Sequence, residues 1–421
     1  MTLDRRHFLV RSGLALATAA LLPELVEEER AVVEAAAPPS WSAVRAQFPL
    51  TRDYLHFAGL LLTSHPAPVR KAIDAHRRAL DRNPVHYLHD QNARREGATL
   101  AAAAAYLGVG ATDIALTDST TMGLGLLYNG LELHPDDEVL TTRHDFRATH
   151  DALSFKAARS GARVRIVSLY AQPATASVDE IVSAVVRGLT PRTRAVALTW
   201  VHSSTGVKLP LRAIAAALGE AGSDRGDAGR ILLCVDGVHG LGVEDVTLTG
   251  LGCDFFVAGC HKWLFGPRGT GLVWGHPRAW PAVTPTIPTF SGGTPAGELT
   301  PGGFKPFEHR WALAEAFRFH RSLGKARVTA RIHALNRRLK AGLAAMPHVS
   351  LYTPRSDGLS AGLVCFDVDR LSPGAVVEAL RRRRIIASVT PYATSYARLA
   401  PGLVNSPAEV DRVLAAIRSL R

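Results

Sequence analysis

The chain has 421 residues, of which 47% are hydrophobic and 20% charged, and its formal net charge is +12. This length is too great for one small core and suits two packed domains of a folded globular protein. The positive charge does not predict a nucleic-acid partner, because the arginines are scattered and no basic stripe is interleaved with aromatic residues. The one dense run, Arg381–Arg384, follows a predicted helix at Pro373–Leu380, where cations suit the helix dipole.

The first 37 residues have the pattern of an export signal. Arg5 and Arg6 precede Phe8 and a mildly apolar run that is too short to span a bilayer. Residues 35–37 offer a cleavage site of the A-x-A type near Ala37. A frayed N-terminal helix is the alternative, but the order of these features favours a twin-arginine signal. We therefore expect the twin-arginine export machinery as a partner and a periplasmic or extracellular location.

From residue 114 onward, strand-like and helix-like patterns alternate. The candidate strands are Ile114–Leu116, Glu138–Thr142, Arg163–Leu169, Ala195–Val201, Ile231–Val235, Phe255–Ala258 and Gly271–Trp274. Short β-branched runs that alternate with helices predict an α/β domain whose sheet is mostly parallel and covered on both faces. Sheets of this kind bind ligands at the carboxyl ends of their strands.

The pattern changes after residue 300. A long helical stretch, Glu308–Ala344, leads to a smaller segment with candidate strands at Leu363–Val368 and Ile385–Val389. We predict that residues 38–300 form an N-terminal arm and a large α/β domain. Residues 301–421 are expected to form a connecting helix and a small C-terminal α+β domain.

The cysteines indicate neither a metal site nor a disulfide framework. They show no C-x-x-C pair and no zinc spacing. Three lie in or beside apolar strand-like runs, where a free cysteine is usually a small buried hydrophobe. The four are Cys234, Cys253, Cys260 and Cys365.

Polar residues follow the first two predicted strands. Ser119, Thr120 and Thr121 open a helix, and hydroxyls with free backbone N–H groups at a helix N-terminus suit a phosphate. Serine and threonine are also ordinary helix caps, and the stretch lacks both the P-loop and the dinucleotide-binding patterns. After the second strand, Phe146 stands among His144 and His150. Their spacing matches no common metal motif, and an aromatic ring stacked on a flat ligand explains Phe146 at least as well.

The later strand ends carry a carboxylate and a lysine. Asp236 ends a buried-looking strand, where a carboxylate is costly unless it meets a cation, a metal or a strong donor. His261 and Lys262 follow the next strand. A phosphate site, a flat-ring partner, a buried carboxylate and a strand-end lysine suit pyridoxal 5′-phosphate (PLP). Burial and nearby positive charge would lower the pKa of the lysine. If Lys262 were considered alone, an ordinary exposed loop lysine would explain it. That interpretation does not explain why the Ser/Thr cluster and Asp236 also stand at strand ends of the same chain.

The order "DSTTMG … HDFRATH … VHSSTG … VDGVHGLG … GCHKWLFGPRGTG" resembles the class V aminotransferase family of fold-type I PLP enzymes. Within it, the closest resemblance is to the isopenicillin N epimerase-like branch, alongside the cysteine desulfurases. The resemblance implies the fold of a fold-type I PLP-dependent transferase and a homodimer. The export signal, "TPGGFKPFEHRWAL" and "HDFRATH" are similar to those of exported members that tailor siderophores such as pyoverdines.

The resemblance also implies a role for each site residue. Lys262 would form the Schiff base with the cofactor and then transfer the proton, and Asp236 would pair with the pyridine nitrogen. His239 and Ser203 would lie near the ring oxygen, and Phe146 would stack on the ring. Arg398 would grip a substrate carboxylate bidentately. Phosphate contacts would come from Thr120, Thr121 and His261, with Ser119 adjoining.

Two departures from the family pattern narrow the chemistry. The desulfurase loop carries a nucleophilic cysteine shortly before the arginine, whereas "IIASVTPYATSYARL" has none. Persulfide-forming chemistry is therefore disfavoured. Phe304 takes the place of a partner-subunit threonine that touches the phosphate in relatives, so the backbone N–H groups of Gly302 and Gly303 are expected to serve instead.

We therefore expect an exported PLP enzyme that acts at the Cα of an amino-acid-like group, as an aminotransferase or an epimerase. A secreted metabolite or peptide would be the substrate. The alternative is a C–S β-lyase or a desulfurase-like enzyme. A PLP-fold binding protein without turnover is disfavoured, since binding alone requires neither Lys262 nor Asp236.

Overall fold

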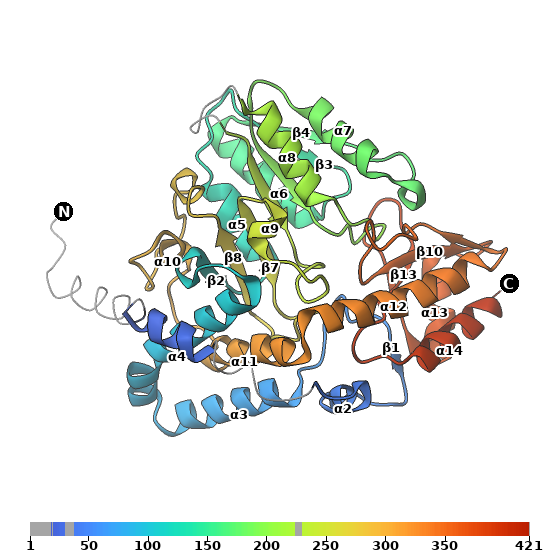
Figure 1. Cartoon of the computed structure of the whole chain (residues 1–421), viewed down its shortest axis with the longest axis horizontal. Coiled ribbons are helices and arrows are strands. Elements are labelled where there is room, and N and C mark those ends of the chain that lie inside the picture. The colour runs from blue at the N-terminus through green and yellow to red at the C-terminus, as the bar shows by residue number, and fades with distance from the viewer. Residues whose placement is uncertain (1–17, 19, 30–37, 224–229, 421) are drawn as a thin grey trace, which may run out of the picture.

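The computed structural model describes residues 18, 20–29, 38–223 and 230–420 (Figure 1). Arg5, Arg6, Phe8 and the predicted cleavage site at residues 35–37 lie outside the described residues. Among the residues that the structure does describe, no helix is both long and apolar enough to cross a membrane.

A seven-stranded sheet forms the centre of the large domain, with the strand order β2-β8-β7-β6-β5-β3-β4. Its strands are β2 (Ile114–Thr117), β3 (Glu138–Thr142), β4 (Arg163–Val167), β5 (Thr193–Thr199), β6 (Leu232–Asp236), β7 (Phe255–Gly259) and β8 (Gly271–Gly275). Neighbouring strands from β7 to β4 are parallel, and β8 alone runs antiparallel to its two neighbours. The predicted α/β fold with a mostly parallel sheet is confirmed.

Helices cover both faces of this sheet. They are α5 (Thr120–Gly130), α6 (Arg147–Ser160), α7 (Val178–Gly188), α8 (Leu211–Ala221) and α9 (Leu248–Leu251). Along β5, Val196 and Leu198 join the hydrophobic layer that contains residues of α7 and α8. Ala195 and Ala197 join the layer that contains residues of α5 and α6. Because successive strand side chains point to opposite faces, one short strand contributes to both layers.

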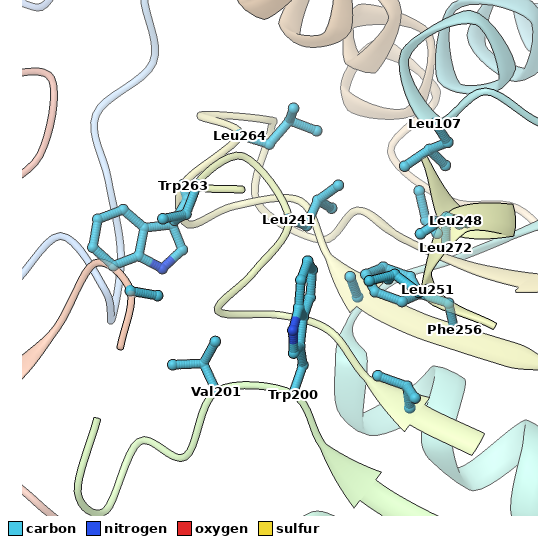
Figure 2. Close-up of a cluster of buried hydrophobic side chains, with 14 of the residues drawn as sticks. Leu107, Trp200, Val201, Leu241, Leu248, Leu251, Phe256, Trp263, Leu264 and Leu272 are labelled. Carbon is cyan, nitrogen blue, oxygen red and sulfur yellow. The ribbon is translucent and has the colours of Figure 1, made fainter. Parts of the chain in front are cut away.

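The cluster in Figure 2 lies in the first of these layers, close to the carboxyl ends of β5 and β7. Trp200 directly follows β5, and its ring packs edge-on against Phe256 of β7, with ring centroids 6.2 Å apart. Trp263 is buried in the same cluster although it belongs to the loop after β7. Burial of this ring fixes the position of its neighbour in the chain, Lys262.

The large domain also contains helices from the N-terminal arm and from the chain after β8 (Figure 1). They are α2 (Trp41–Ala46), α3 (Ala67–Arg82), α4 (Pro84–Leu107), α10 (Pro295–Leu299) and α11 (Phe307–Leu323). The predicted helical stretch Glu308–Ala344 is two helices, α11 and α12 (Lys325–Ala344). They are separated at Gly324, whose φ of 79° lies in a region that L side chains rarely adopt. The expectation of one continuous connecting helix was therefore wrong.

A second, antiparallel sheet forms the small domain, with the order β12-β13-β10-β9. Its strands are β9 (Val349–Leu351), β10 (Val364–Val368), β12 (Ser388–Val389) and β13 (Ala397–Leu399), and its helices are α13 (Pro373–Arg382) and α14 (Pro407–Arg418). The predicted strand Ile385–Val389 is divided, because β11 (Ile385–Ile386) pairs with β1 (Leu55–His56) of the N-terminal arm. The arm is thereby joined to the small domain.

Residues 20–29 form a helix that packs against the large domain. Leu25 is buried there, and a Cβ atom built on Gly97 of α4 would lie only 2.7 Å from Leu25 Cδ1. The absence of a side chain at Gly97 therefore makes room for Leu25. Nearby, Arg94 of α4 forms an ion pair with Glu28 at 3.3 Å.

Glu29 joins the same helix to α11. Only 2% of Glu29 is exposed, and its carboxylate accepts hydrogen bonds from Arg318 Nε at 2.6 Å and from Arg321 Nη1 at 3.3 Å. Arg321 also donates to the backbone carbonyl of Glu29 at 3.0 Å. Part of the predicted signal segment thus makes buried contacts with the large domain.

Candidate active site

A cavity of about 210 Å³ opens at the carboxyl ends of the parallel strands. All ten side chains that the sequence analysis singled out line it, namely Ser119, Thr120, Thr121, Phe146, Ser203, Asp236, His239, His261, Lys262 and Arg398. Seven further residues line the same cavity and were not predicted, namely Leu60, Leu61, Leu124, Ala148, Thr199, Val238 and Pro391. Leu60 and Leu61 come from the N-terminal arm, and nothing in their local sequence places them beside the distant strand ends.

The start of α5 and the end of β7 form one side of the cavity. Ser119 caps α5, its Oγ accepting a hydrogen bond from the Met122 N–H at 3.1 Å. Thr120 Oγ1 accepts from the Gly259 N–H at 2.7 Å, which ties the helix to β7. A Cβ atom on Gly259 would lie 3.0 Å from both Thr120 Oγ1 and His261 Cε1. This tight junction presents a helix N-terminus to the cavity, a suitable place for a phosphate.

Asp236 lies at the end of β6 and is buried. Burial raises the pKa of its carboxyl to about 6, although the Val238 N–H and the nearby Lys262 oppose the rise. The only hydrogen bond to it among the described residues is the one that the Val238 N–H donates at 3.1 Å. Beside it, Thr199 Oγ1 is buried with no hydrogen-bond partner in the described chain. The carboxylate of Asp236 can therefore accept a hydrogen bond from a protonated ring nitrogen. The positive charge of that nitrogen would favour the ionised form of Asp236.

Lys262 contacts His239, with Lys262 Nζ and His239 Nε2 3.3 Å apart. Burial lowers the pKa of His239 well below its usual value, so the ring is neutral. The Trp263 indole N–H can only donate, and it donates to His239 Nδ1 at 3.4 Å. A neutral His239 therefore carries its proton on Nε2, which faces Lys262 Nζ. An ammonium group has no lone pair to accept this proton, so the hydrogen bond forms when Lys262 is a neutral amine, the form that dominates above its pKa of about 8.

Arg398 enters the cavity from β13 of the small domain. Only 2% of its surface is exposed, and burial lowers the pKa of its guanidinium. Its Nε donates to Ser388 Oγ at 3.1 Å, and its Nη1 donates to the Ser203 carbonyl at 2.7 Å. None of the ion pairs found within the described ranges includes Arg398. A buried cation without a counter-ion is costly, so this position suits an anionic ligand such as a carboxylate.

Together these residues fit PLP. The helix N-terminus of α5 would hold the phosphate, Asp236 the ring nitrogen and Lys262 the aldehyde carbon. When bound, PLP supplies an aldehyde that reacts with amines and a ring that withdraws electrons from the adjacent Cα.

Comparison with known proteins agrees with this geometry. Residues 63–391 match the sequence model of the family described as "Aminotransferase class-V". The chain belongs to this family. Isopenicillin N epimerase of Streptomyces clavuligerus is 30% identical over 330 residues, which cover 73% of this chain and 80% of that protein. A probable cysteine desulfurase of Vibrio cholerae is 25% identical over 415 residues, which cover 89% and 97% of the two chains.

Solved structures share the fold. The complex of the cystine C-S lyase C-DES with its reaction product cysteine persulfide has a TM-score of 0.80 and 25% identity. It covers 89% of this chain and 99% of C-DES. The apo cysteine desulfurase of Thermococcus onnurineus NA1 has a TM-score of 0.78 and 20% identity, and it covers 92% of this chain and 98% of its own. This class V chain is thus a fold-type I enzyme with PLP as its cofactor.

None of the four cysteines of this class V enzyme lines the cavity. All four are free and buried, as expected. Cys365 lies in β10 beside Arg398, and burial raises the pKa of its thiol to about 12. A thiol with so high a pKa is not a thiolate at neutral pH, and the thiolate is the nucleophile.

Three further histidines, His144, His150 and His202, do not line the cavity. His144 stacks on Tyr170 with ring centroids 4.1 Å apart, and His202 Nδ1 lies 2.9 Å from the Tyr170 hydroxyl. Burial lowers the pKa of both histidines to about 3. His150 Nε2 lies 2.7 Å from the Thr142 carbonyl. Within the described ranges, no group of three or more His, Cys, Asp or Glu residues could hold a metal ion.

The pKa of Lys262 predicts how PLP capture depends on pH. The pKa of Lys262 is lowered to about 8, mainly by burial; the charge of Asp236 opposes the decrease and that of Arg398 adds to it. Only the neutral amine attacks an aldehyde, so its fraction, and the rate of PLP capture by the apoenzyme, should rise with pH through about 8 and then level off. Stopped-flow absorbance after mixing with PLP measures this rate, and N-acetyl-lysine is the control. A rate that rises only near pH 10, as for the control, would contradict a lowered pKa.

Proposed function

We propose that this enzyme acts at the Cα of an amino-acid-like substrate, by transamination or epimerisation. The observation that carries the proposal is that Lys262, Asp236 and Arg398 line one cavity. Arg398, buried without a counter-ion, would bind the substrate carboxylate and so hold the Cα near Lys262. The neutral amine of Lys262 would then remove or return the Cα proton, since a neutral amine is a base and an ammonium is not. Similarity to isopenicillin N epimerase supports this reading.

A second candidate is C–S β-lyase activity. The structural likeness to the cystine C-S lyase C-DES favours it, at 25% identity over 89% of this chain. β-Elimination also begins at the Cα proton and requires no nucleophilic cysteine. The burial of Cys365 therefore argues against a desulfurase but not against a lyase.

Deuterium incorporation separates these possibilities without a known substrate. The PLP-loaded enzyme is incubated in D₂O with a panel of L- and D-amino acids and with cystine, and the products are read by mass spectrometry and chiral chromatography. Deuterium at Cα with inversion supports epimerisation, and a keto acid formed with an amino acceptor supports transamination. Pyruvate and ammonia from cystine support the lyase. If none of the panel exchanges its Cα proton faster than with the Lys262→Ala control, the proposal is wrong for amino acids.

We also propose that the twin-arginine machinery exports this enzyme to act on a secreted metabolite or peptide. The support is the order of Arg5, Arg6, Phe8 and the apolar run, together with the resemblance to exported siderophore-tailoring members. That machinery transports folded proteins, which suits an enzyme that takes up its cofactor in the cytoplasm.

Replacing both Arg5 and Arg6 by lysine should retain the enzyme in the cytoplasm, folded and loaded with PLP. Lysine preserves the charge but lacks the planar guanidinium fork that a receptor can read. Cell fractionation followed by immunoblotting measures the distribution, and Arg11→Lys is the matched control that should leave it unchanged. Wild-type amounts of the double variant outside the inner membrane would show that this segment is not the signal.

We further propose that the enzyme works as a homodimer. Exposed apolar side chains within residues 287–304 support this. Phe304 is 84% exposed, and Ile287 and Phe290 are also exposed. The segment is held in shape by a hydrogen bond from the Gly302 N–H to the Pro288 carbonyl at 2.8 Å. Light scattering should give twice the chain mass, and Phe304→Asp should shift the protein toward monomer. A wild-type monomer with full activity would refute the proposal.

A further inference from the structure

Tyr392 is a residue of the small domain that reaches across to the active site. It lies in the loop between β12 and β13, six residues before Arg398. Backbone and side-chain hydrogen bonds close this loop at its base, from Thr390 N–H to the Tyr396 carbonyl at 3.0 Å and from Tyr396 N–H to Thr390 Oγ1 at 2.9 Å. The Tyr392 hydroxyl lies 2.7 Å from Ser203 Oγ of the large domain.

Ser203 contacts both Tyr392 and the arginine that faces the cavity. Its side chain contacts the Tyr392 hydroxyl, and its backbone carbonyl accepts the 2.7 Å hydrogen bond from Arg398 Nη1. Only one other acceptor for Arg398 is found among the described residues, the hydroxyl of Ser388. The direction of the guanidinium therefore depends on where the Ser203 carbonyl points.

The turn that carries Ser203 is fixed at its other residues. The Gly206 N–H donates to the His202 carbonyl at 2.7 Å, and the Tyr170 hydroxyl lies 2.9 Å from Thr205 Oγ1. Thr353 of the small domain donates to the Thr205 carbonyl at 2.7 Å. The Ser203 side chain, by contrast, has Tyr392 as its one hydrogen-bond partner within the described chain.

The chemistry of Tyr392 suits a fixed support rather than a proton carrier. Burial raises the pKa of its phenol well above the usual value, so the group stays neutral across the physiological range and can donate to Ser203. Its ring also meets the edge of Phe146, with ring centroids 6.3 Å apart. The phenol therefore contacts both the serine and an aromatic ring that lines the cavity.

We propose that Tyr392 is a positioning residue for the substrate carboxylate. Its hydroxyl holds Ser203, and the Ser203 carbonyl keeps Arg398 aimed into the cavity. This inference rests on the proposed function, because it takes the ligand of Arg398 to be the carboxylate of an amino-acid-like substrate.

Two small amines test the inference without knowledge of the natural substrate. Glycine carries a carboxylate and methylamine does not, and binding of either to the PLP-loaded enzyme is followed by the change in cofactor absorbance. The Kd of glycine should rise about 2- to 10-fold in Tyr392→Phe, the range for the loss of one neutral hydrogen bond. The Kd of methylamine should stay unchanged, because that probe never contacts Arg398.

Three further variants make the result specific. Ser203→Ala should raise the Kd of glycine to a similar extent, and the double variant should be no weaker than either single one, because both remove the same hydrogen bond. Tyr396→Phe is the matched control: it is a tyrosine of the same loop, and no hydrogen bond of its hydroxyl is found among the described residues. Equal cofactor absorbance and melting temperature show that each variant is folded.

The possible results are distinct. An unchanged Kd of glycine in Tyr392→Phe, or equal weakening of both probes, overturns the role of Tyr392 in carboxylate positioning. A wild-type enzyme that binds glycine no better than methylamine overturns the role of Arg398, and with it the proposed function.

Discussion

Lys262→Ala should abolish both the yellow colour of the purified protein and the attachment of PLP by borohydride. Lys262 is the lysine that lines the cavity, together with Asp236 and Arg398, whose charges both act on it. Without its amine there is neither a group to capture the aldehyde nor a base beside the Cα. Catalysis should fall by at least about 1,000-fold, as for the loss of a covalent catalyst.

Mass spectrometry of a borohydride-treated digest measures the attachment. In the wild type, the cofactor mass should be on the peptide that contains residue 262. Lys305→Ala is the matched control, because burial lowers the pKa of Lys305 to about 8 as well, yet Lys305 lines a different, much smaller cavity. Colour and label should persist in that variant. A label that survives in Lys262→Ala, or moves to Lys305, would show that the attachment site is elsewhere.

Asp236→Asn should leave PLP bound but nearly inactive. Asparagine keeps the shape of the side chain and can still accept the Val238 N–H, so the fold should persist. It cannot supply the negative charge that keeps a ring nitrogen protonated, and the ring would then withdraw electrons poorly from Cα. A loss of about 100-fold or more in the rate of Cα deuterium exchange is expected, typical of removing one electrostatic stabiliser.

A variant that keeps the carboxylate separates the loss of negative charge at position 236 from a change in side-chain shape. Asp236→Glu restores the carboxylate but adds a methylene to a buried position, so it should be less stable yet more active than Asp236→Asn. The cofactor absorbance and the exchange rate are measured on the same samples. If Asn exchanges as fast as the wild type, Asp236 does not act on the ring nitrogen.

The large domain could be predicted because six of its seven strands are almost entirely buried, the edge strand β4 being the exception. In the sequence, strands such as β5 and β7 are short apolar runs. The predicted strand ends differ from the observed ones by at most two residues. The carboxyl ends of parallel strands converge, so residues far apart in the chain could be assigned to one site. The structure places all ten of them around the same cavity.

Features without a local signal were missed. The two-residue strand β1 exists only because it pairs with β11, more than 300 residues later. The contact between Ser203 and Tyr392 spans 189 positions and joins two domains, so no spacing in the sequence could predict it. Gly324 was passed over because a single glycine inside a helical pattern is often tolerated, whereas its positive φ ends α11 here.

Because Glu29 forms ion pairs with α11, removal of the proposed signal would change the surface of the large domain as well as the length of the chain. The proposed cleavage near Ala37 would remove Glu29, which would leave Arg318 with Glu315 as its partner, at 2.6 Å, and Arg321 with no carboxylate among the described residues. It would also remove Leu25, which packs on Gly97. Precursor and product would then carry different surfaces on α4 and α11. An acidic probe that binds Arg318 and Arg321 would therefore distinguish a processed molecule from an unprocessed one. The difference would be permanent, because proteolysis is irreversible.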